Sequence, residues 1–346
     1  MRILMKGNEA MAEAAVRAGL ELYVGYPITP QSEMVEYLSA RMPELGRSFI
    51  QSESEVISIN AAMGGAMTGA KVMTSSSGVG ISLMQEGITA AFGKRAPLVL
   101  INVNRCGWGM GGGKNVFAGG QGDYLRDTRG GGNGDYRIPV FCPCDLQEAV
   151  DLVYGAFDIA LRYRTPVEIM TEGRLGQMME DIELPEMKEV APRPEWGLTG
   201  ERRGIDFNNV PAFVQVESMK QIEENEQRWE LYRCDDAEIV IVSLGIISRV
   251  CHGAIDAMRE KGIKVGMLRV ISCWPFPVEG FEALPESVKA FATVEMNVRG
   301  EMIEDVKITC KDLIRYNSTP IFEWHEDDLP DESVICDFIE DINNKL

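Results

Sequence analysis

The chain has 346 residues, of which 45% are hydrophobic, and its 53 acidic and 34 basic side chains give a net charge of −19. A chain of this length can bury a sizeable core and is long enough for two or three domains. The acidity belongs to residues 176–346, which carry 35 acidic against 18 basic side chains. Nucleic-acid binding needs a basic face that neutralises phosphates, so this charge argues against that class of protein.

No window of the sequence reaches 18 uncharged apolar residues, and the N-terminal stretch MRILMKGNEA has no long apolar run. We therefore expect neither a membrane span nor a secretory signal, and we expect a cytoplasmic protein. The eight cysteines show no CxxC spacing, and the chain has only two histidines, His252 and His325. We therefore expect no metal ligands in this chain and no Ser-His-Asp triad.

Apolar runs rich in β-branched residues alternate with helical patterns, which is typical of parallel βαβ units. The strands are predicted, in chain order, at 21–26, 47–51, 71–76, 96–103 and 166–172. The helices between them are predicted at 5–20, 30–42, 55–70, 80–94 and 145–164. Together these elements form a first domain, 1–180.

The pattern changes beyond this domain. Residues 181–236 hold a proline-bearing connection and a charged helix over 215–233, without a comparably strong strand pattern. The βαβ rhythm then resumes with a strand at 237–245, a helix at 249–262 and a strand at 264–276. We therefore expect 181–236 to be a linker with a charged helix and 237–346 to be a smaller α/β domain.

Two phosphate-binding motifs are suggested and then excluded in the glycine-rich segment 107–134, where 12 of 28 residues are glycine. Its GxGxxG spacing, Gly107 to Gly112, is separated from the preceding strand and is not followed by a helical pattern, which argues against a dinucleotide site. Its GGGK at 111–114 lacks the first glycine of a P-loop and is followed by asparagine. Such a segment either lets the backbone approach a ligand or a neighbouring chain closely, or forms a mobile loop.

Two carboxylates, Glu53 and Glu55, precede a stretch that carries no charge as far as Ala70. Ser52 and Glu55 have the S-x-x-E spacing of a capping box, which by itself explains a glutamate at this place. On a helix that begins near Ser52, residues two apart point to nearly opposite sides, so only one of the two glutamates is able to face a site.

Three further segments follow predicted strands at the same edge of the sheet, where open parallel sheets bind ligands. GYPITPQSE, 25–33, places Thr29 between two prolines, and TSSSGVG, 74–80, brings hydroxyls and glycines to a second turn. INVNR, 101–105, ends a buried strand on Arg105, and an arginine is well shaped to hold a carboxylate through two hydrogen bonds.

The chain resembles the alpha subunit of the 2-oxoacid:ferredoxin oxidoreductases, thiamine-diphosphate enzymes that oxidise 2-oxoacids to acyl-CoA. The resemblance covers nearly the whole chain, and the segments that carry it are YPITP, SESE, TSSSG, QGDY, VGMLRVISCWPFP and VEMNVRGEMIEDVK. It implies an α/β fold, in which a pyrimidine-type thiamine-diphosphate-binding domain with a parallel sheet precedes a transketolase C-terminal-like α/β domain. The length and the wording GYPITPQSE are most similar to the branched-chain (2-oxoisovalerate) and 2-oxoglutarate groups.

The resemblance also implies which residues act. It places at Glu55 the glutamate that hydrogen-bonds to ring nitrogen N1′ of the cofactor, a role that needs a poorly hydrated site beside an apolar wall. It places Thr29 beside the reacting carbon and Arg105 on the substrate carboxylate, which completes the expected catalytic set. The expected cofactor-binding residues are Pro27, Ile28, Thr29, Glu55, Ser76, Ser77 and Gly78.

A GDG motif with a later asparagine normally holds the cofactor diphosphate through a divalent ion, and this motif is not found. GD occurs only before tyrosine, at Gly122 and Gly134, and the pair Asn208 and Asn209 is out of register. The resemblance therefore implies a beta subunit that holds the diphosphate and Mg²⁺, a gamma subunit, and a ferredoxin-like subunit with the iron–sulfur clusters. Ferredoxin, CoA and the 2-oxoacid are the implied reactants.

Two alternatives stay open. One is a subunit of a non-oxidative, thiamine-dependent 2-oxoacid decarboxylase, although that class is expected to lack the transketolase-like domain. The other is a non-catalytic scaffold that keeps the fold, against which the presence of Thr29, Glu55 and Arg105 counts.

Overall fold

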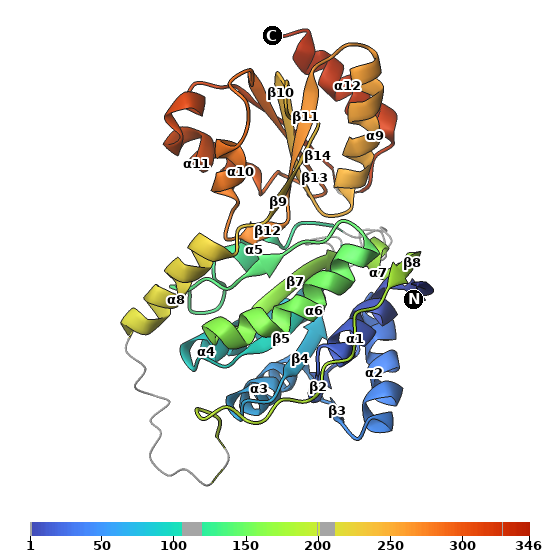
Figure 1. Cartoon of the computed structure of the whole chain (residues 1–346), viewed down its shortest axis with the longest axis vertical. Coiled ribbons are helices and arrows are strands. Elements are labelled where there is room, and N and C mark those ends of the chain that lie inside the picture. The colour runs from blue at the N-terminus through green and yellow to red at the C-terminus, as the bar shows by residue number, and fades with distance from the viewer. Residues whose placement is uncertain (1, 106–119, 199, 201–211, 327) are drawn as a thin grey trace.

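A computed structural model describes residues 2–105, 120–198, 200, 212–326 and 328–346. Two twisted sheets, each covered by helices on both faces, lie one above the other (Figure 1). The GxGxxG and GGGK motifs, Cys106 and the pair Asn208 and Asn209 lie outside the described residues. Within the described residues, no helix is both long enough and apolar enough to span a bilayer.

The first sheet has seven strands in the order β12-β6-β7-β5-β4-β2-β3, all parallel except β12, which is antiparallel to β6. The bounds of its strands are β2 Leu22–Gly25, β3 Ser48–Gln51, β4 Val72–Ser76, β5 Leu98–Asn104, β6 Val140–Phe141, β7 Val167–Glu172 and β12 Ser272–Trp274. One face packs against α1 (Gly7–Arg17), α2 (Ser32–Glu44) and α6 (Leu146–Tyr163). The other face packs against α3 (Glu55–Met67) and α4 (Val79–Gly93).

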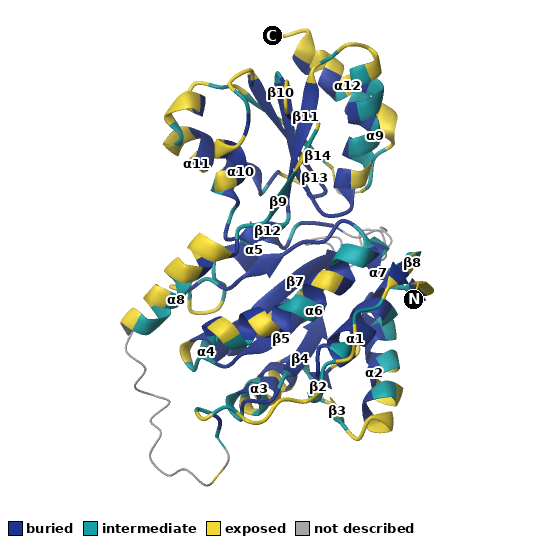
Figure 2. Ribbon diagram, viewed as in Figure 1, coloured by how far each residue is buried: buried dark blue, intermediate teal, exposed yellow. Residues whose placement is uncertain are grey.

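The central strands are buried over their whole length, as Figure 2 shows. Strands covered by helices on both faces need continuous apolar runs, and LVLINVN of β5 is such a run. By contrast, α6 is amphipathic and begins at an N-cap, Asp145, whose carboxylate accepts a hydrogen bond from the backbone N–H of Glu148 at 2.8 Å.

The strand order reverses between β2 and β4. From β2 the chain continues outward to β3, whereas from β4 it continues in the other direction to β5. Open α/β sheets bind ligands at such a switch point, outside the carboxyl ends of the strands. The turns that follow β2, β3, β4 and β5 carry all the predicted site residues, so the topology brings them to one edge.

The second sheet has five strands in the order β14-β13-β10-β11-β9, with β9 antiparallel to β11 and the others parallel. Its strands are β9 Trp229–Tyr232, β10 Ile239–Leu244, β11 Val265–Val270, β13 Ala290–Glu295 and β14 Ile321–His325. In Figure 1, α9 (Ile247–Glu260) and α12 (Glu332–Asn343) cover one face, and α10 (Val278–Glu282) and α11 (Ile303–Asp312) cover the other. The remaining short elements are α5 Tyr124–Thr128, α7 Gly173–Gln177 and the 3₁₀ turn Ile314–Tyr316.

Several predicted elements need correction. The strand predicted over 264–276 is two strands, β11 in the second sheet and β12 in the first, because the chain crosses between the sheets at Ile271. The charged helix is α8, Ala212–Asn225, and it gives way to β9, whose backbone hydrogen bonds come from β11. The helix predicted over 5–20 begins at Gly7, because residues 5 and 6 belong to β1 (Arg2–Lys6), which pairs with β8 (Met179–Glu183). The domain limits 1–180, 181–236 and 237–346 stay a prediction.

Buried polar contacts connect the two sheets. The side-chain amide of Gln121 donates to the carboxylate of Glu172 and to the carbonyl of Leu244, both at 2.8 Å, and its oxygen accepts from the N–H of Met296 at 2.8 Å. Glu172 ends β7, Leu244 ends β10, and Met296 follows β13. Gln121 thus ties the carboxyl edge of the first sheet to that of the second.

Candidate active site

The turn after β2 carries Pro27, Ile28 and Thr29, which are half-buried or exposed. A chain of hydrogen bonds holds this turn. The hydroxyl of Tyr23 pairs with that of Ser75 at 2.7 Å, and Ser75 donates to the side-chain oxygen of Gln31, also at 2.7 Å. The amide of Gln31 then donates to the carbonyl of Tyr26 at 3.1 Å. Sequence reasoning missed Gln31 and Ser75, since no local pattern indicates their contact.

Ser76 ends β4, and Ser77 and Gly78 form the turn that follows it. Both serine side chains are fully buried, and neither hydroxyl has a hydrogen-bond partner among the described residues. Gly78 adopts a φ of +46°, and a Cβ there would lie 3.0 Å from Nε of Arg105. Glycine is therefore required at this position for its backbone conformation and for space.

Arg105 directly follows β5 and reaches across to the first turn, where Nη1 donates to the carbonyl of Thr29 at 3.2 Å. Its side chain is half-buried and forms no ion pair within the described part of the chain. The structure thus brings together Thr29, Gly78 and Arg105, which lie up to 76 residues apart in the sequence.

Glu55 begins α3 and is only 5% exposed, whereas Glu53 is exposed. Among the described residues, none donates a hydrogen bond to the Glu55 carboxylate. The predicted capping box is wrong, because the N-cap is Ser54, whose hydroxyl accepts from the N–H of Ile57 at 3.4 Å. The hydroxyl of Ser52 instead contacts that of Ser58. Capping therefore does not explain the burial of Glu55.

Gly80, in the first turn of α4, joins these features. A Cβ on Gly80 would lie 2.0 Å from the hydroxyl oxygen of Ser76 and 2.6 Å from Oε1 of Glu55. The carboxylate and the hydroxyl therefore lie side by side against bare backbone, and neither has a partner. Burying a hydroxyl without a partner costs free energy, so this arrangement fits a ligand that supplies the missing hydrogen bond to Ser76.

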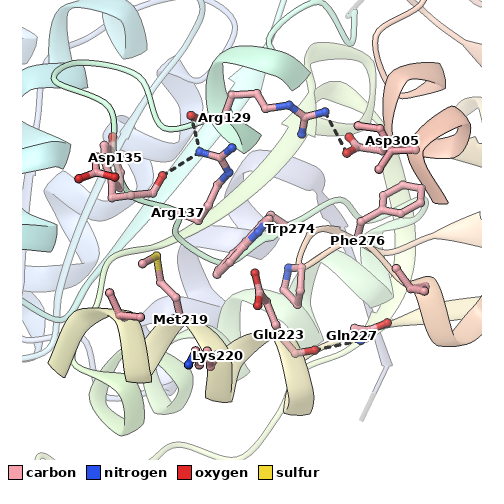
Figure 3. A pocket seen from close by; sticks show the side chains of 15 residues that line it. Arg129, Asp135, Arg137, Met219, Lys220, Glu223, Gln227, Trp274, Phe276 and Asp305 are labelled. Carbon is pink, nitrogen blue, oxygen red and sulfur yellow. Dashed lines mark hydrogen bonds and ion pairs between the residues drawn. The ribbon is translucent and has the colours of Figure 1, made fainter. Parts of the chain in front are cut away.

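A cavity of about 820 Å³ lies elsewhere, between α8, α10 and α11, and Figure 3 shows it. Arg129, Arg137 and Trp274 are among the residues that line it, and none of the predicted site residues does so. Arg137 donates hydrogen bonds to the backbone carbonyls of Arg129 and Tyr136, which are drawn as dashed lines in Figure 3. Within the described ranges, no group of three or more His, Cys, Asp or Glu side chains is placed to hold a metal ion.

The structure is a doubly wound α/β sheet with a buried glutamate and two unpartnered serines at its switch point, the place where open α/β sheets bind ligands. The family model described as pyruvate flavodoxin/ferredoxin oxidoreductase, thiamine-diphosphate-binding, matches residues 13–234. The model for pyruvate:ferredoxin oxidoreductase core domain II matches 237–321. The chain belongs to this family of thiamine-diphosphate-binding oxidoreductases, as the resemblance predicted.

Curated relatives are similar over most of their length. The ketoisovalerate oxidoreductase subunit VorB of Methanothermobacter thermautotrophicus is 42% identical over 325 residues, which cover 90% of this chain and 91% of the relative. The 2-oxoglutarate synthase subunit KorA of Archaeoglobus fulgidus is 32% identical over 321 residues, which cover 89% of this chain and 91% of the relative.

Solved structures share the fold. The 2-oxoglutarate:ferredoxin oxidoreductase of Magnetococcus marinus, solved with 2-oxoglutarate, coenzyme A and succinyl-CoA bound, aligns with a TM-score of 0.86 at 21% identity. The alignment covers 98% of this chain and 65% of that one. A split-gene transketolase aligns over 97% of both chains with a TM-score of 0.61 at 16% identity. These matches confirm the predicted fold class.

Proposed function

We propose that the chain is the alpha subunit of a thiamine-diphosphate-dependent 2-oxoacid:ferredoxin oxidoreductase that is active only with partner subunits. The reaction is the CoA-dependent oxidative decarboxylation of a 2-oxoacid to acyl-CoA and CO₂, with reduction of ferredoxin. The observation that carries this proposal is the Glu55 carboxylate, buried without a donor beside Ser76 and across the edge from Arg105.

Glu55, Ser76 and Ser77 are the groups of this chain that would hold the aminopyrimidine half of thiamine diphosphate, with Pro27, Ile28, Thr29 and Gly78 around it. When bound, the cofactor supplies an acidic ring carbon that becomes a nucleophile for the carbonyl of the 2-oxoacid. Glu55 would hold the pyrimidine ring at N1′ through a hydrogen bond in which the proton is shared. Glu55 is only 5% exposed, so little water would compete for this hydrogen bond.

Arg105 binds the substrate carboxylate. One guanidinium nitrogen is used by the Thr29 carbonyl, which leaves other N–H groups of the half-buried fork for a charge-assisted hydrogen bond. The same contact orients the Thr29 turn, so the threonine hydroxyl and the arginine approach the substrate from one side. Positioning and charge neutralisation are therefore the contributions of these two residues.

Partner subunits complete the site in this proposal. Val56 and Ile57 of α3 and Val79 and Leu83 of α4 are exposed apolar side chains in the first turns of the two helices that flank the site. We name these four residues the α3–α4 apolar face. Exposed apolar side chains on neighbouring helices are typical of an interaction site. Its place beside Glu55 suits the beta subunit, which would bring the diphosphate and Mg²⁺ to the same cofactor.

The gamma subunit and a ferredoxin-like subunit with iron–sulfur clusters belong to the same proposal, as does the cytoplasmic location. The proposed substrate is 2-oxoisovalerate, because the relative at 42% identity is a ketoisovalerate oxidoreductase subunit. The second candidate is 2-oxoglutarate, because the relative at 32% identity is a 2-oxoglutarate synthase subunit.

The experiment that tests this proposal is an assay of the purified complex with 2-oxoisovalerate, 2-oxoglutarate and pyruvate, each with CoA and ferredoxin. We expect ferredoxin reduction that requires CoA and has its highest kcat/KM with 2-oxoisovalerate. CO₂ release without ferredoxin reduction would instead identify a non-oxidative decarboxylase. A complex that releases no CO₂ from any of the three would leave the scaffold alternative.

A further inference from the structure

A buried ionic cluster lies beside the proposed site and has no role in the function described so far. It is formed by Asn102 of β5, Glu168 of β7, and Asp123, Arg126 and Asp127 in and before α5. Nε of Arg126 donates to Asp127 at 2.8 Å, and Nη2 lies 2.8 Å from a carboxylate oxygen of Asp123. The amide of Asn102 donates to Asp127 at 2.7 Å and to Asp123 at 3.2 Å. The aspartates therefore hold the guanidinium from two sides.

The third guanidinium nitrogen of Arg126 points out of the cluster toward the site. Nη1 donates to the carbonyl of Gly78 at 2.9 Å and to the hydroxyl of Ser82 at 3.1 Å. Gly78 is the N-cap of α4 and has the φ of +46° that shapes the serine-glycine turn. Arg126 is thus the side chain that attaches this turn to α5.

The Arg126 guanidinium stays positively charged in this cluster. Burial lowers the pKa of its guanidinium, but the neighbouring Asp127 and Asp123 raise it further, so the net shift is upward. Burial raises the pKa of Glu168 well above its usual range, and the nearby Asp127 raises it too, which favours its neutral form. The cluster therefore presents one fixed cation to the Gly78 carbonyl.

We propose that Arg126 is a positioning residue for the cofactor site, acting through Gly78. Its hydrogen bond fixes the carbonyl of Gly78. This keeps the Ser76 hydroxyl beside Glu55 and holds the Gly78 backbone where the Arg105 side chain packs against it. A buried ionic cluster is poor evidence for stability by itself, because desolvation offsets most of the attraction. Arg126, however, donates its remaining N–H groups to the Gly78 carbonyl and the Ser82 hydroxyl, which indicates that it fixes the position of this turn.

This inference rests on the proposed function. Its test compares Arg126→Lys with Arg129→Lys in the assembled complex. Lysine keeps the buried charge but is unable to bridge both aspartates and the Gly78 carbonyl. The control changes an arginine one helical turn further on, which pairs at 2.9 Å with Asp305 of the second domain and does not touch the turn.

We expect Arg126→Lys to raise the dissociation constant for thiamine diphosphate about tenfold, which corresponds to about 1.4 kcal/mol. We also expect faster amide hydrogen exchange in 76–82, while exchange in β5 and β7 stays unchanged. Arg129→Lys should leave both quantities as in the wild type. A lower Tm with unchanged cofactor affinity and unchanged exchange in 76–82 would show that Arg126 is only a structural brace and would overturn the inference.

A second variant covers a failure of Arg126→Lys to fold. The double variant Arg126→Gln and Asp127→Asn removes one charge of each sign, so the net charge of the cluster is unchanged, and Asp123 keeps its hydrogen bond from Asn102. It should show the same faster exchange in 76–82, and normal exchange there contradicts the inference. A wild-type complex that oxidises no 2-oxoacid would refute the proposed function, whereas the exchange comparison would still decide the role of Arg126.

Discussion

Glu55 and Gly80 lie in contact although they belong to different helices, so that a Cβ on Gly80 would be 2.6 Å from Oε1 of Glu55 and 2.9 Å from its Cγ. Glu55 is the first residue of α3, and Gly80 is the second residue of α4. The position of the carboxylate is therefore set by the absence of a side chain on the neighbouring helix.

The first prediction is that Gly80→Ala moves the carboxylate and disables the site. The new methyl group collides with the Ser76 hydroxyl and with Glu55, and a small displacement of a catalytic group costs about 10²-fold in rate. Steady-state kinetics of the assembled complex measure this loss. Gly93→Ala is the control on the same helix, because a Cβ at Gly93 would have no neighbouring atom of a described residue within 4 Å. If Gly80→Ala turns over as fast as Gly93→Ala, the contact does not matter.

The second prediction concerns Arg105, which we propose holds the substrate carboxylate. Arg105→Ala should lower kcat/KM by ~10²-fold, because a charge-assisted hydrogen bond contributes about 1.5–3 kcal/mol. Arg105→Lys should recover part of the loss, since it keeps the charge but not the fork that also holds the Thr29 carbonyl. Kinetics with varied 2-oxoacid concentration make the measurement, and an Ala variant with wild-type kcat/KM would remove Arg105 from the site.

The sequence predicted the parallel sheet and the order of its elements well, because these depend on local periodicity and on the edge where strands end. The poorly hydrated place of Glu55 was implied by the family resemblance instead. It failed at Ser52, since the N-cap is Ser54, two residues later than the capping-box spacing indicates. It failed at β12 as well, because an apolar run does not reveal which sheet it joins. The contacts of Gln31, Ser75 and Arg126 join segments 44 to 48 residues apart, and no local pattern encodes them.

The third prediction is a pH dependence of stability due to Glu172, which ends β7 at the junction of the two sheets. Burial raises its pKa from 4.5 to about 7, although the Gln121 side chain and the N–H of Ile246 oppose the shift. Between these two values the unfolded chain has released the proton while the folded chain still binds it. Stability contributed by this group is therefore present at low pH and is lost as the pH rises from 4.5 to about 7.

Glu172→Gln removes this titration and keeps the oxygen that accepts from Gln121. Thermal unfolding should give matching Tm values for wild type and variant near pH 5, and at pH 8 the variant should be higher by several degrees, since two to three pKa units correspond to about 3 kcal/mol. Glu36→Gln, which changes an exposed carboxylate on α2, should follow the wild type at every pH. Parallel curves for wild type and Glu172→Gln would be inconsistent with this account.

The fourth prediction concerns the α3–α4 apolar face. Leu83, which is 54% exposed, should become part of the interface with the beta subunit, so Leu83→Lys buries a charge there and weakens assembly by 10²-fold or more. Ile314→Lys is the matched control on the second domain, because Ile314 is 86% exposed and lies away from this face. Titration of each variant with the partner subunits measures assembly. Equal affinities for the two variants would place the interface elsewhere.

In the proposed mechanism Glu55 activates the cofactor, and comparing Glu55→Gln with Glu53→Gln isolates this role. Glutamine fills the same buried space but has no carboxylate to share a proton with N1′, so turnover by the assembled complex should fall by ~10²-fold or more. Glu53 is exposed, and its variant should stay within a few-fold of wild type. Silent behaviour of Glu55→Gln, with full turnover at saturating cofactor, would contradict the account, whichever way Glu53→Gln behaves.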